Sequence, residues 1–276
     1  MGGHLPQPRN TRNTRNMLNP RNPSSLRGWR WPAWVAGVLL LSLMGPLGVM
    51  AFGDIDLQTP WHRSTRDSTG QAPDPALVHE AVVQVYGART VRWRGAFAIH
   101  PWIAVKRAGA DSYTVYQKIG WRAYRGGDAV VLSQTETPDT HWYGAAPQLL
   151  AERRGAEVEA LIDRIEAAVA RYPWGGQYRL WPGPNSNTFV AHVARQVPEL
   201  GLDLPPTAIG KDYLGATTLL APAPSGSGWQ LSLGGLAGVT VAREEGLEIN
   251  LLSLSFGIDV NDGRLRLPGL GSWPTR

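Results

Sequence analysis

The chain has 276 residues and a formal net charge of +5, and this charge is concentrated at its N-terminus. Residues 1–30 contain six arginines and no acidic residue, which leaves 21 basic and 22 acidic residues in the rest of the chain. A nucleic-acid-binding domain carries its own basic face, so this nearly neutral body excludes nucleic acid as the expected partner. The absence of cysteine excludes disulfides, zinc–thiolate sites and cysteine nucleophiles.

Two N-terminal segments predict a membrane anchor. Residues 1–30 are expected to form a basic, disordered cytoplasmic arm, and residues 31–52 to form a transmembrane helix. The twenty residues from Ala33 to Phe52 carry no charge, which matches the roughly 20 residues that span a bilayer. Lipid of the inner or plasma membrane is therefore the first expected partner.

Charges on either side of the apolar segment predict its orientation. Arg27 and Arg30 precede it, and Asp54 and Asp56 follow it. Because basic residues favour the cytoplasmic side of a membrane, we expect a cytoplasmic N-terminus and an extracytoplasmic body. The alternative is a cleaved signal peptide with a site at residues 49–51, although the apolar segment exceeds the ~7–15 residues of a signal-peptide core.

Beyond the anchor, composition divides the chain into a linker, a domain and a tail. Residues 53–76 are rich in Pro, Gly, Ser and Thr and predict a linker. Residues 77–270 are expected to form one extracytoplasmic globular domain, followed by a tail over residues 271–276. About 190 residues are enough for a single core that needs no disulfide.

Within this domain the patterns predict an α+β fold with the order strands, two helices, strands. Apolar residues spaced by three and four predict two helices, each followed by a proline, at 158–172 and 187–197. Runs of β-branched and aromatic residues bounded by turns predict strands at 82–86, 97–105, 113–116, 130–132, 229–233, 239–242 and 247–251.

His100 is the first candidate catalytic residue. Alternation along the strand places Ile99 and Ile103 on one face and His100 and Trp102 on the other. Pro101 follows the histidine, and proline within a strand predicts an edge or a bulge, where side chains are often directed at a site. The alternative is a buried histidine satisfied by a backbone group.

Ser186 is the candidate nucleophile, because it stands where the second helix begins. Helix-terminal amides and the helix dipole offer donors and positive charge to an oxyanion. Asn and Ser are also among the best helix caps, so the alternative is that Ser186 only caps its helix. Asn185 is a second candidate for the cap.

Three segments, His100–Lys106, Trp181–Phe189 and Ile209–Leu214, make residues 78–270 resemble an uncharacterised bacterial family of unknown function. That resemblance implies no activity. More distantly, a strand histidine followed by an Asn-nucleophile-x-x-Phe motif is similar to the circularly permuted papain-like fold of lecithin:retinol acyltransferase and related amidases. Those enzymes have cysteine where this chain has Ser186, in the sequence Asn185-Ser-Asn-Thr-Phe189.

The exchange of cysteine for serine changes the chemistry that the resemblance implies. A thiol is ionised by a helix terminus and a neighbouring imidazolium, whereas a serine hydroxyl needs a base within about 3 Å that is oriented by a third group. We expect His100 to be this base. Gln117, His141 and Asp212 are candidates for the third group, and His141 is preferred.

The substrate groove is expected between the two motif segments, with Trp102 and Trp181 as walls and Asn185 and Asn187 as polar contacts. Such a groove suits an envelope glycan or a peptide. No metal or cofactor is expected, because the histidines lack metal-ligand spacing and the Gly234–Gly238 turn lacks the dinucleotide fingerprint.

The sequence thus predicts a membrane-anchored Ser/His amide or ester hydrolase, or an acyltransferase, acting on a cell-envelope substrate. The alternative is a catalytically inactive binding module for an envelope glycan, peptide or protein.

Overall fold

The computed structural model describes residues 1–3 and 30–274. The predicted basic arm therefore lies almost entirely outside the described residues. The chain divides into two units, Met1–Leu40 and Leu41–Arg276, and the second contains the whole predicted domain.

The predicted apolar helix forms as α1 (Arg30–Phe52). By length and composition, its residues Pro32–Phe52 are able to cross a membrane. In the part that belongs to the second unit, Ser42, Pro46 and Val49 are buried, whereas Leu43 is exposed. One face of the last three turns therefore packs against the domain.

The first half of the domain forms a five-stranded antiparallel sheet in the order β4-β3-β2-β1-β5. Its strands are β1 (Val82–Arg89), β2 (Ile99–Lys106), β3 (Tyr113–Lys118), β4 (Val130–Thr135) and β5 (Gln148–Arg154). The first four are the predicted strands. The fifth, QLLAERR, was not predicted, because it lacks the alternation of apolar and polar residues that marks a half-buried strand.

Both predicted helices are present, as α3 (Val158–Ala170) and α4 (Ser186–Gln196). Both pack on one face of the five-stranded sheet, in a core that includes Ile99 and Ile103. Trp102 packs in a second cluster with Tyr86 on the other face, so the predicted alternation along β2 is confirmed. Short helices η2 (Arg92–Ala96), α2 (Gly120–Tyr124) and η3 (Pro198–Leu200) connect these elements.

Pro101 lies in an inner strand, which corrects the expectation that β2 is an edge. Pairing of β2 with β1 covers the whole strand, but pairing with β3 covers only Ile103–Val105. One side of β2 is therefore unpaired at Pro101, where a residue without an N–H group is tolerated.

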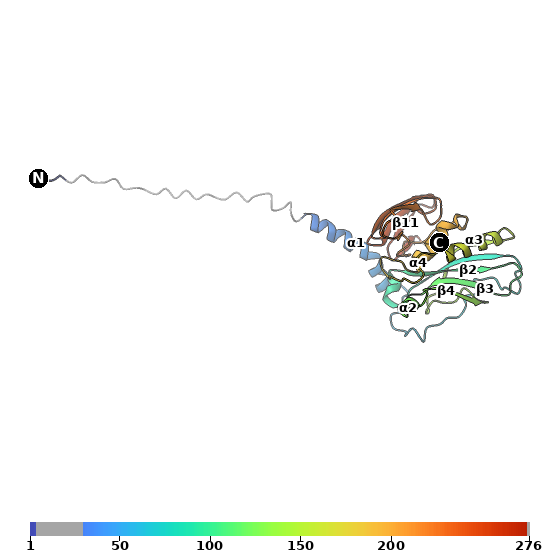
Figure 1. Cartoon of the computed structure of the whole chain (residues 1–276). Helices are drawn as coiled ribbons and strands as arrows, with labels where there is room; N and C mark the ends of the chain where they lie inside the picture. The colour runs from blue at the N-terminus through green and yellow to red at the C-terminus, as the bar shows by residue number, and fades with distance from the viewer. Residues whose placement is uncertain (4–29, 275–276) are drawn as a thin grey trace. The chain divides into compact units, whose positions relative to one another are not determined.

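The C-terminal part forms a seven-stranded antiparallel meander in the order β12-β11-β10-β9-β8-β7-β6. It contains the three predicted strands and extends on both sides of them, so that residues 271–273, expected in the tail, form a strand. The strands are β6 (Leu220–Pro222), β7 (Gly228–Leu233), β8 (Ala237–Ala242), β9 (Gly246–Leu251), β10 (Leu254–Asp259), β11 (Arg264–Leu267) and β12 (Gly271–Trp273). Helix α4 lies between the two sheets (Figure 1), because its Arg195 side chain binds Gln230 of β7 and the Pro222 carbonyl.

The predicted linker is partly attached to the domain. Ser68 and Thr69 donate hydrogen bonds to the Asp139 carboxylate, as does the backbone N–H of Gln71. Burial alone would raise the pKa of Asp139, but these hydrogen bonds lower it below its usual value. The segment before the domain is therefore held beside the β4–β5 connection.

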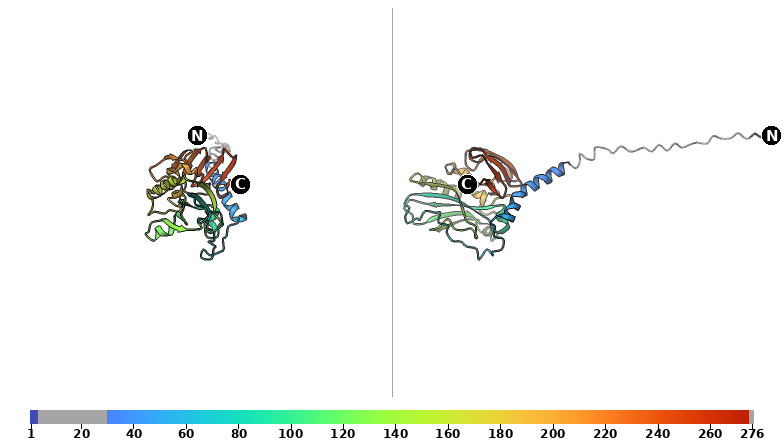
Figure 2. Two further views of the ribbon diagram at one scale, coloured as in Figure 1. Left: turned by 90° about the vertical axis from the view of Figure 1, so that its right-hand side faces the viewer. Right: turned by 180° about the vertical axis from the view of Figure 1, so that it is seen from behind.

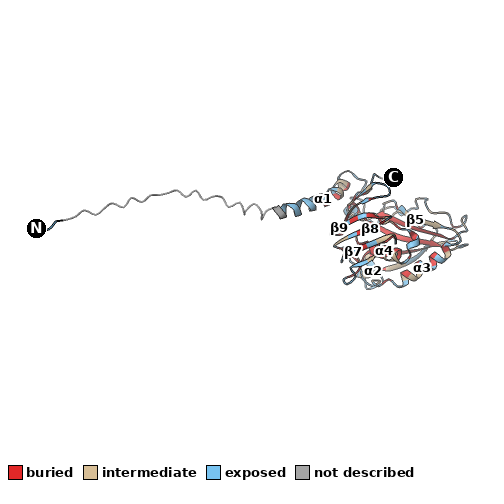
Figure 3. Ribbon diagram, turned by 90° about the horizontal axis from the view of Figure 1, so that it is seen from above, coloured by how far each residue is buried: buried red, intermediate tan, exposed pale blue. Residues whose placement is uncertain are grey.

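The seven-stranded sheet has its polar face inside and its apolar face outside. Arg266, which is fully buried, binds both carboxylate oxygens of Asp203 at 2.6 and 2.7 Å and Glu248 at 2.5 Å. Lys211 binds the same glutamate at 2.7 Å and donates to the Leu204 carbonyl. Figures 2 and 3 show this curved sheet and the buried residues in its strands.

We expect this buried ion cluster to control the stability of the domain. Replacing Glu248 with Ala leaves Arg266 and Lys211 buried without their shared anion, and should cost about 3–5 kcal/mol of unfolding free energy. The matched control is Glu199→Ala at the exposed Arg164–Glu199 pair, which should cost less than about 1 kcal/mol. Denaturant unfolding of the detergent-solubilised full chain measures both, and equal effects would contradict the assignment.

Candidate functional site

Asn185 caps helix α4. Its side chain accepts a hydrogen bond from the Thr188 N–H at 3.1 Å, and the Thr188 hydroxyl accepts one from the Asn185 N–H, which completes a capping box. The Asn185 amide nitrogen also donates to the carbonyls of Leu180 and Ile209. Since all its polar atoms are used within the fold, Asn185 is a structural residue rather than a free substrate contact.

Ser186 occupies the first position of the helix and is only 4% exposed. Its side chain and backbone hydrogen-bond with the Tyr178 hydroxyl. Burial raises the pKa of Tyr178 and these hydrogen bonds lower it, with a net increase, so the phenol stays protonated at neutral pH. Because Asn185 is the residue that caps the helix, Ser186 is not the helix cap.

His100 is buried on β2 beside an aromatic layer. Its Nε2 lies 3.2 Å from Oε1 of Gln117 on β3, and its ring stacks on Trp142 with centroids 3.8 Å apart. Burial lowers the pKa of His100 to about 4, although the Gln117 hydrogen bond opposes this change. The imidazole is therefore neutral at pH 7.

The contact with Gln117 fixes the tautomer of His100. An amide oxygen only accepts hydrogen bonds, so Nε2 must carry the proton and donate it to Oε1. Nδ1 then holds the lone pair in the neutral ring. The unprotonated Nδ1 is the form that a general base requires, but the pKa of about 4 makes this buried ring a weak base.

Ser186 and His100 line the same pocket, of about 360 Å³. No hydrogen bond joins the two side chains within the described part of the chain, since Ser186 meets Tyr178 and His100 meets Gln117. The walls are mostly apolar and include Trp93, Phe97, Leu180, Trp181, Leu252 and Leu254.

A second, aromatic pocket of about 770 Å³ adjoins the first and shares His100, Tyr178 and Leu180 with it. Its lining also includes Trp61, Trp121, Trp142 and Tyr143. Together the two pockets make a long apolar groove, which we call the aromatic groove. Arg94 belongs to both linings and is exposed.

Asn187 places an unused acceptor at the wall of the smaller pocket. Its amide nitrogen donates to the carbonyls of Ile99 and Ile209 at 3.2 and 2.9 Å, which fixes the orientation of the amide. Its Oδ1 is buried and has no hydrogen-bond partner among the described residues. A buried acceptor without a partner costs about 1–3 kcal/mol, so a donor on a bound molecule would be stabilised there.

The other predicted site residues lie elsewhere. Nδ1 of His141 donates a hydrogen bond to the Asp67 carbonyl at 2.8 Å, and the partner of His100 is Gln117, not the preferred His141. Trp102 donates to the Pro138 carbonyl and packs in the core, away from the pocket that holds Ser186. Trp181 lines that pocket. Asp212 precedes the C-terminal sheet in the chain and contacts its buried polar face, where it accepts a hydrogen bond from Asn250 of β9.

Tyr178 and Lys118 were missed by the sequence reasoning. Lys118 is fully buried and donates to the Tyr172 hydroxyl and the Trp174 carbonyl, both at 3.0 Å. Burial lowers its pKa to about 7. Both residues lie in ordinary strand or loop sequence, so only the folded geometry brings them to the groove.

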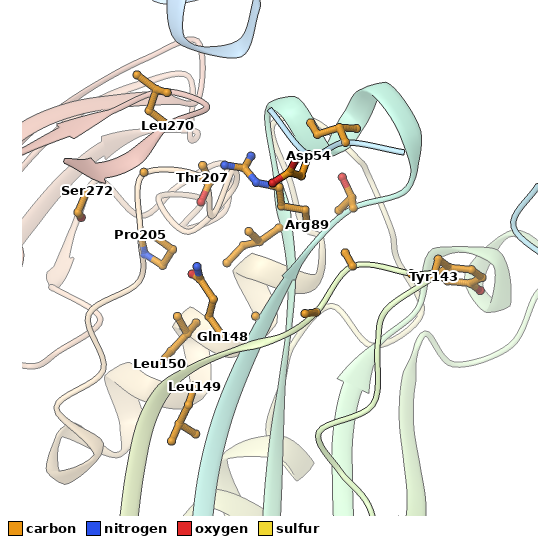
Figure 4. Close-up of a pocket in the computed structure, with 18 of the residues that line it drawn as sticks. Asp54, Arg89, Tyr143, Gln148, Leu149, Leu150, Pro205, Thr207, Leu270 and Ser272 are labelled. Carbon is orange, nitrogen blue, oxygen red and sulfur yellow. The ribbon is translucent and has the colours of Figure 1, made fainter. Parts of the chain in front are cut away.

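A separate cavity of about 810 Å³ is a different site (Figure 4). Arg89 of β1, Gln148 of β5 and Ser272 of β12 contribute to its lining, which contains neither Ser186 nor His100. Across residues 1–3 and 30–274, no group of three or more His, Asp or Glu side chains is placed to hold a metal ion.

Residues 80–213 match the model of a family described as "Protein of unknown function (DUF3750)", so this part of the chain is similar to that uncharacterised domain family. The match contains the segments His100–Lys106 and Trp181–Phe189, ends one residue short of Leu214 in the third segment, and includes both His100 and Ser186. It stops before the seven-stranded sheet begins. No solved structure matches the chain.

The capping geometry predicts that Asn185 and Ser186 differ in their effects on stability. Asn185→Ala removes the cap and two further hydrogen bonds, and should cost about 2 kcal/mol or more of unfolding free energy. Ser186→Ala should cost less than about 1 kcal/mol, because the cap remains. Denaturant unfolding of the two variants measures this difference, and a larger loss for Ser186→Ala would restore the cap assignment.

Burial of His100 predicts a pH-dependent stability. Above pH 6.5 the His100 ring is neutral in both the folded and the unfolded chain. As the pH falls, the ring binds a proton in the unfolded chain near pH 6.5 but in the folded chain only near pH 4. Between pH 6.5 and pH 4, protonation of His100 should therefore lower the free energy of unfolding by about 3 kcal/mol. His100→Phe keeps the aromatic stacking and should lose this part of the pH dependence, measured by denaturant unfolding.

The exposed His79→Phe is the matched control for this measurement, and it should keep the wild-type pH dependence. His192, whose pKa burial also lowers to about 4, contributes equally in all three proteins. An unchanged pH dependence in His100→Phe would show that the ring is accessible to protons in the folded state.

Proposed function

We propose that the protein is a membrane-anchored amide or ester hydrolase, or an acyltransferase, that acts on a cell-envelope substrate through Ser186 and His100. One observation carries the proposal. Ser186 at a helix start and a neutral His100, oriented by Gln117, line the same pocket. A nucleophile, a base and an orienting group are the three parts that serine-based acyl transfer requires.

In the proposed reaction, Nδ1 of His100 takes the Ser186 proton as Oγ attacks the substrate carbonyl carbon. The tetrahedral intermediate collapses when the leaving amine or alcohol takes that proton from His100, which leaves an acyl-serine ester. Water, or an acceptor hydroxyl or amine, then releases the acyl group by the same proton transfers. The base must approach Oγ to about 3 Å or act through one water, and such contacts often tighten only when substrate binds.

Tyr178 and the start of α4 are the proposed stabilisers of the oxyanion. The Tyr178 phenol is a protonated donor beside Ser186, and the first-turn amides contribute the positive end of the helix dipole. Donors held in place before the reaction stabilise developing charge without reorganisation.

The order of these groups along the chain supports the resemblance to the permuted papain-like fold. A histidine on one strand, its orienting residue on the next strand and a nucleophile at a later helix start follow one another as His100, Gln117 and Ser186. Serine in place of cysteine makes the base more important, because a hydroxyl is not ionised in advance.

The lining of the aromatic groove favours a substrate with an apolar chain and an amide or hydroxyl donor. Apolar walls bind acyl or aromatic groups, and Oδ1 of Asn187 offers a buried acceptor to a substrate N–H or O–H. The exposed Arg94 at the groove suits an anionic group on the same molecule. An acylated or peptide-linked envelope component has these properties.

The proposed location follows from the apolar helix α1. Arg27 and Arg30 before the span and Asp54 and Asp56 after it support a cytoplasmic N-terminus and an extracytoplasmic domain.

A binding module for the same envelope components is the second candidate. Ser186 hydrogen-bonds with Tyr178 and not with His100, and this arrangement favours a binding module. In such a module the aromatic groove alone would hold the ligand.

Reaction of Ser186 with an acyl-serine reagent tests the catalytic proposal. We expect a fluorophosphonate to label the wild-type chain at Ser186, Ser186→Ala to lose the label, and His100→Ala to slow labelling by about 10²-fold or more. Gln117→Ala should give an intermediate rate, because the base remains but is no longer oriented. Intact-mass and peptide mass spectrometry measure the labelled fraction.

Ser112→Ala is the control, since this serine lies outside both pocket linings, and it should label at the wild-type rate. Equal labelling of Ser186→Ala, or equal rates in His100→Ala and wild type, would refute the catalytic assignment and leave the binding module.

A further inference from the structure

The outer face of the seven-stranded sheet is apolar across its whole width. Partner residues in adjacent antiparallel strands share a face, so the register defines rows of neighbouring side chains. One row runs from Trp229 through Val241, Leu247, Ile258 and Leu265 to Trp273, and the next contains Leu220, Leu231, Val239, Ile249 and Phe256. We call these two rows the apolar sheet face.

No charged residue interrupts the apolar sheet face, and most of its side chains are exposed. Trp229, Val241 and Ile249 are 60%, 60% and 54% exposed. The largest exposed apolar patch on an ordinary monomer is about 300–600 Å², and larger patches mark sites of protein or membrane contact. A face of two unbroken rows, one over the six strands β7–β12 and one over the five strands β6–β10, belongs to that second class.

Helix α1 packs against the edge of this same sheet. A Cβ atom at Gly45 would lie 2.0 Å from the Pro268 carbonyl oxygen, and one at Gly269 would lie 2.6 Å from the Pro46 nitrogen. The two backbones therefore meet where glycine alone allows it, at the turn between β11 and β12.

The position of this contact along α1 carries the inference. Gly45 precedes the helix end at Phe52 by seven residues, which is about 10 Å at 1.5 Å per residue. If Pro32–Phe52 spans the bilayer, the β11–β12 turn reaches about 10 Å below the point where the span ends. The sheet that carries this turn must then lie at the membrane and not above it on a flexible linker.

We propose that the apolar sheet face is a second membrane-contact surface, which rests in the interfacial layer of the bilayer that α1 crosses. Trp229 and Trp273 lie at the two ends of the first row of the apolar sheet face. Tryptophan favours the interface between lipid and water. The neighbouring turn holds Arg243 and Glu244, both charged, which keeps that edge of the sheet in water.

This inference rests on α1 as the membrane anchor and is independent of the Ser186 chemistry. Apolar side chains that enter the lipid interface gain the free energy of leaving water. Together the helix and the sheet give the domain one fixed orientation on the membrane.

Single cysteines test the proposal cleanly, because the chain has none of its own. We would label Val241→Cys and Ile249→Cys with a polarity-sensitive fluorophore in the full chain, reconstituted in vesicles of phosphatidylethanolamine and phosphatidylglycerol. Leu132→Cys on the edge strand β4 is the matched control, because Leu132 is 59% exposed. Bromine-substituted lipid should quench the two sheet labels about twofold or more relative to the control.

Equal quenching at Val241→Cys, Ile249→Cys and Leu132→Cys would overturn the proposal. So would self-quenching between copies that increases with the protein-to-lipid ratio, because it would show that a second copy covers the face. Near-ultraviolet circular dichroism checks that each labelled variant is folded. Fluorophosphonate labelling in the same vesicles reports the Ser186 reaction separately, so the two proposals fail independently.

Discussion

The fold depends on a buried polar junction between the family-matched domain and the C-terminal sheet. Lys211 and Asp203 belong to the first part, and Glu248 and Arg266 to the second. Ions in a protein interior are tolerated only when each meets its partner, so these strands must direct their polar residues inward. Strand alternation then sends their apolar residues outward, which produces the exposed apolar sheet face.

Hydrogen bonds to two backbone carbonyls hold the candidate site together. The Ile209 carbonyl accepts hydrogen bonds from both Asn185 and Asn187, and the Ile99 carbonyl accepts another from Asn187. These contacts join the three motif segments and place Ser186 next to the strand that carries His100. The hydrogen bonds of the motif asparagines are therefore largely explained as scaffold, although Asn185, Ser186 and Asn187 all line the pocket.

Periodicity predicted most elements because it depends only on neighbours along the chain. The two longer helices, the first four strands, the two faces of β2 and three of the seven meander strands, β7–β9, followed from it. Strand β5 had no clear period, and β6 and β10–β12 were not predicted. Alternation in β7–β9 defined two faces but not which one is buried, since that depends on distant partners such as Lys211 and Arg195. Gln117 was one of three candidates for the orienting role, and its contact with His100 requires the spatial arrangement of β2 and β3.

The candidate site and the apolar sheet face meet at the β9–β10 turn. Leu252 and Leu254 line the pocket that holds Ser186, and the Leu252 carbonyl accepts a hydrogen bond from the Trp181 indole. Leu254 also continues β10 toward Phe256 and Ile258 of the sheet face. If that face contacts lipid, the pocket wall is continuous with the contact surface, and apolar substrate would reach Ser186 from the bilayer without crossing water. Under the two proposals together, the hydrocarbon walls of this pocket extend the lipid-facing surface as far as Ser186.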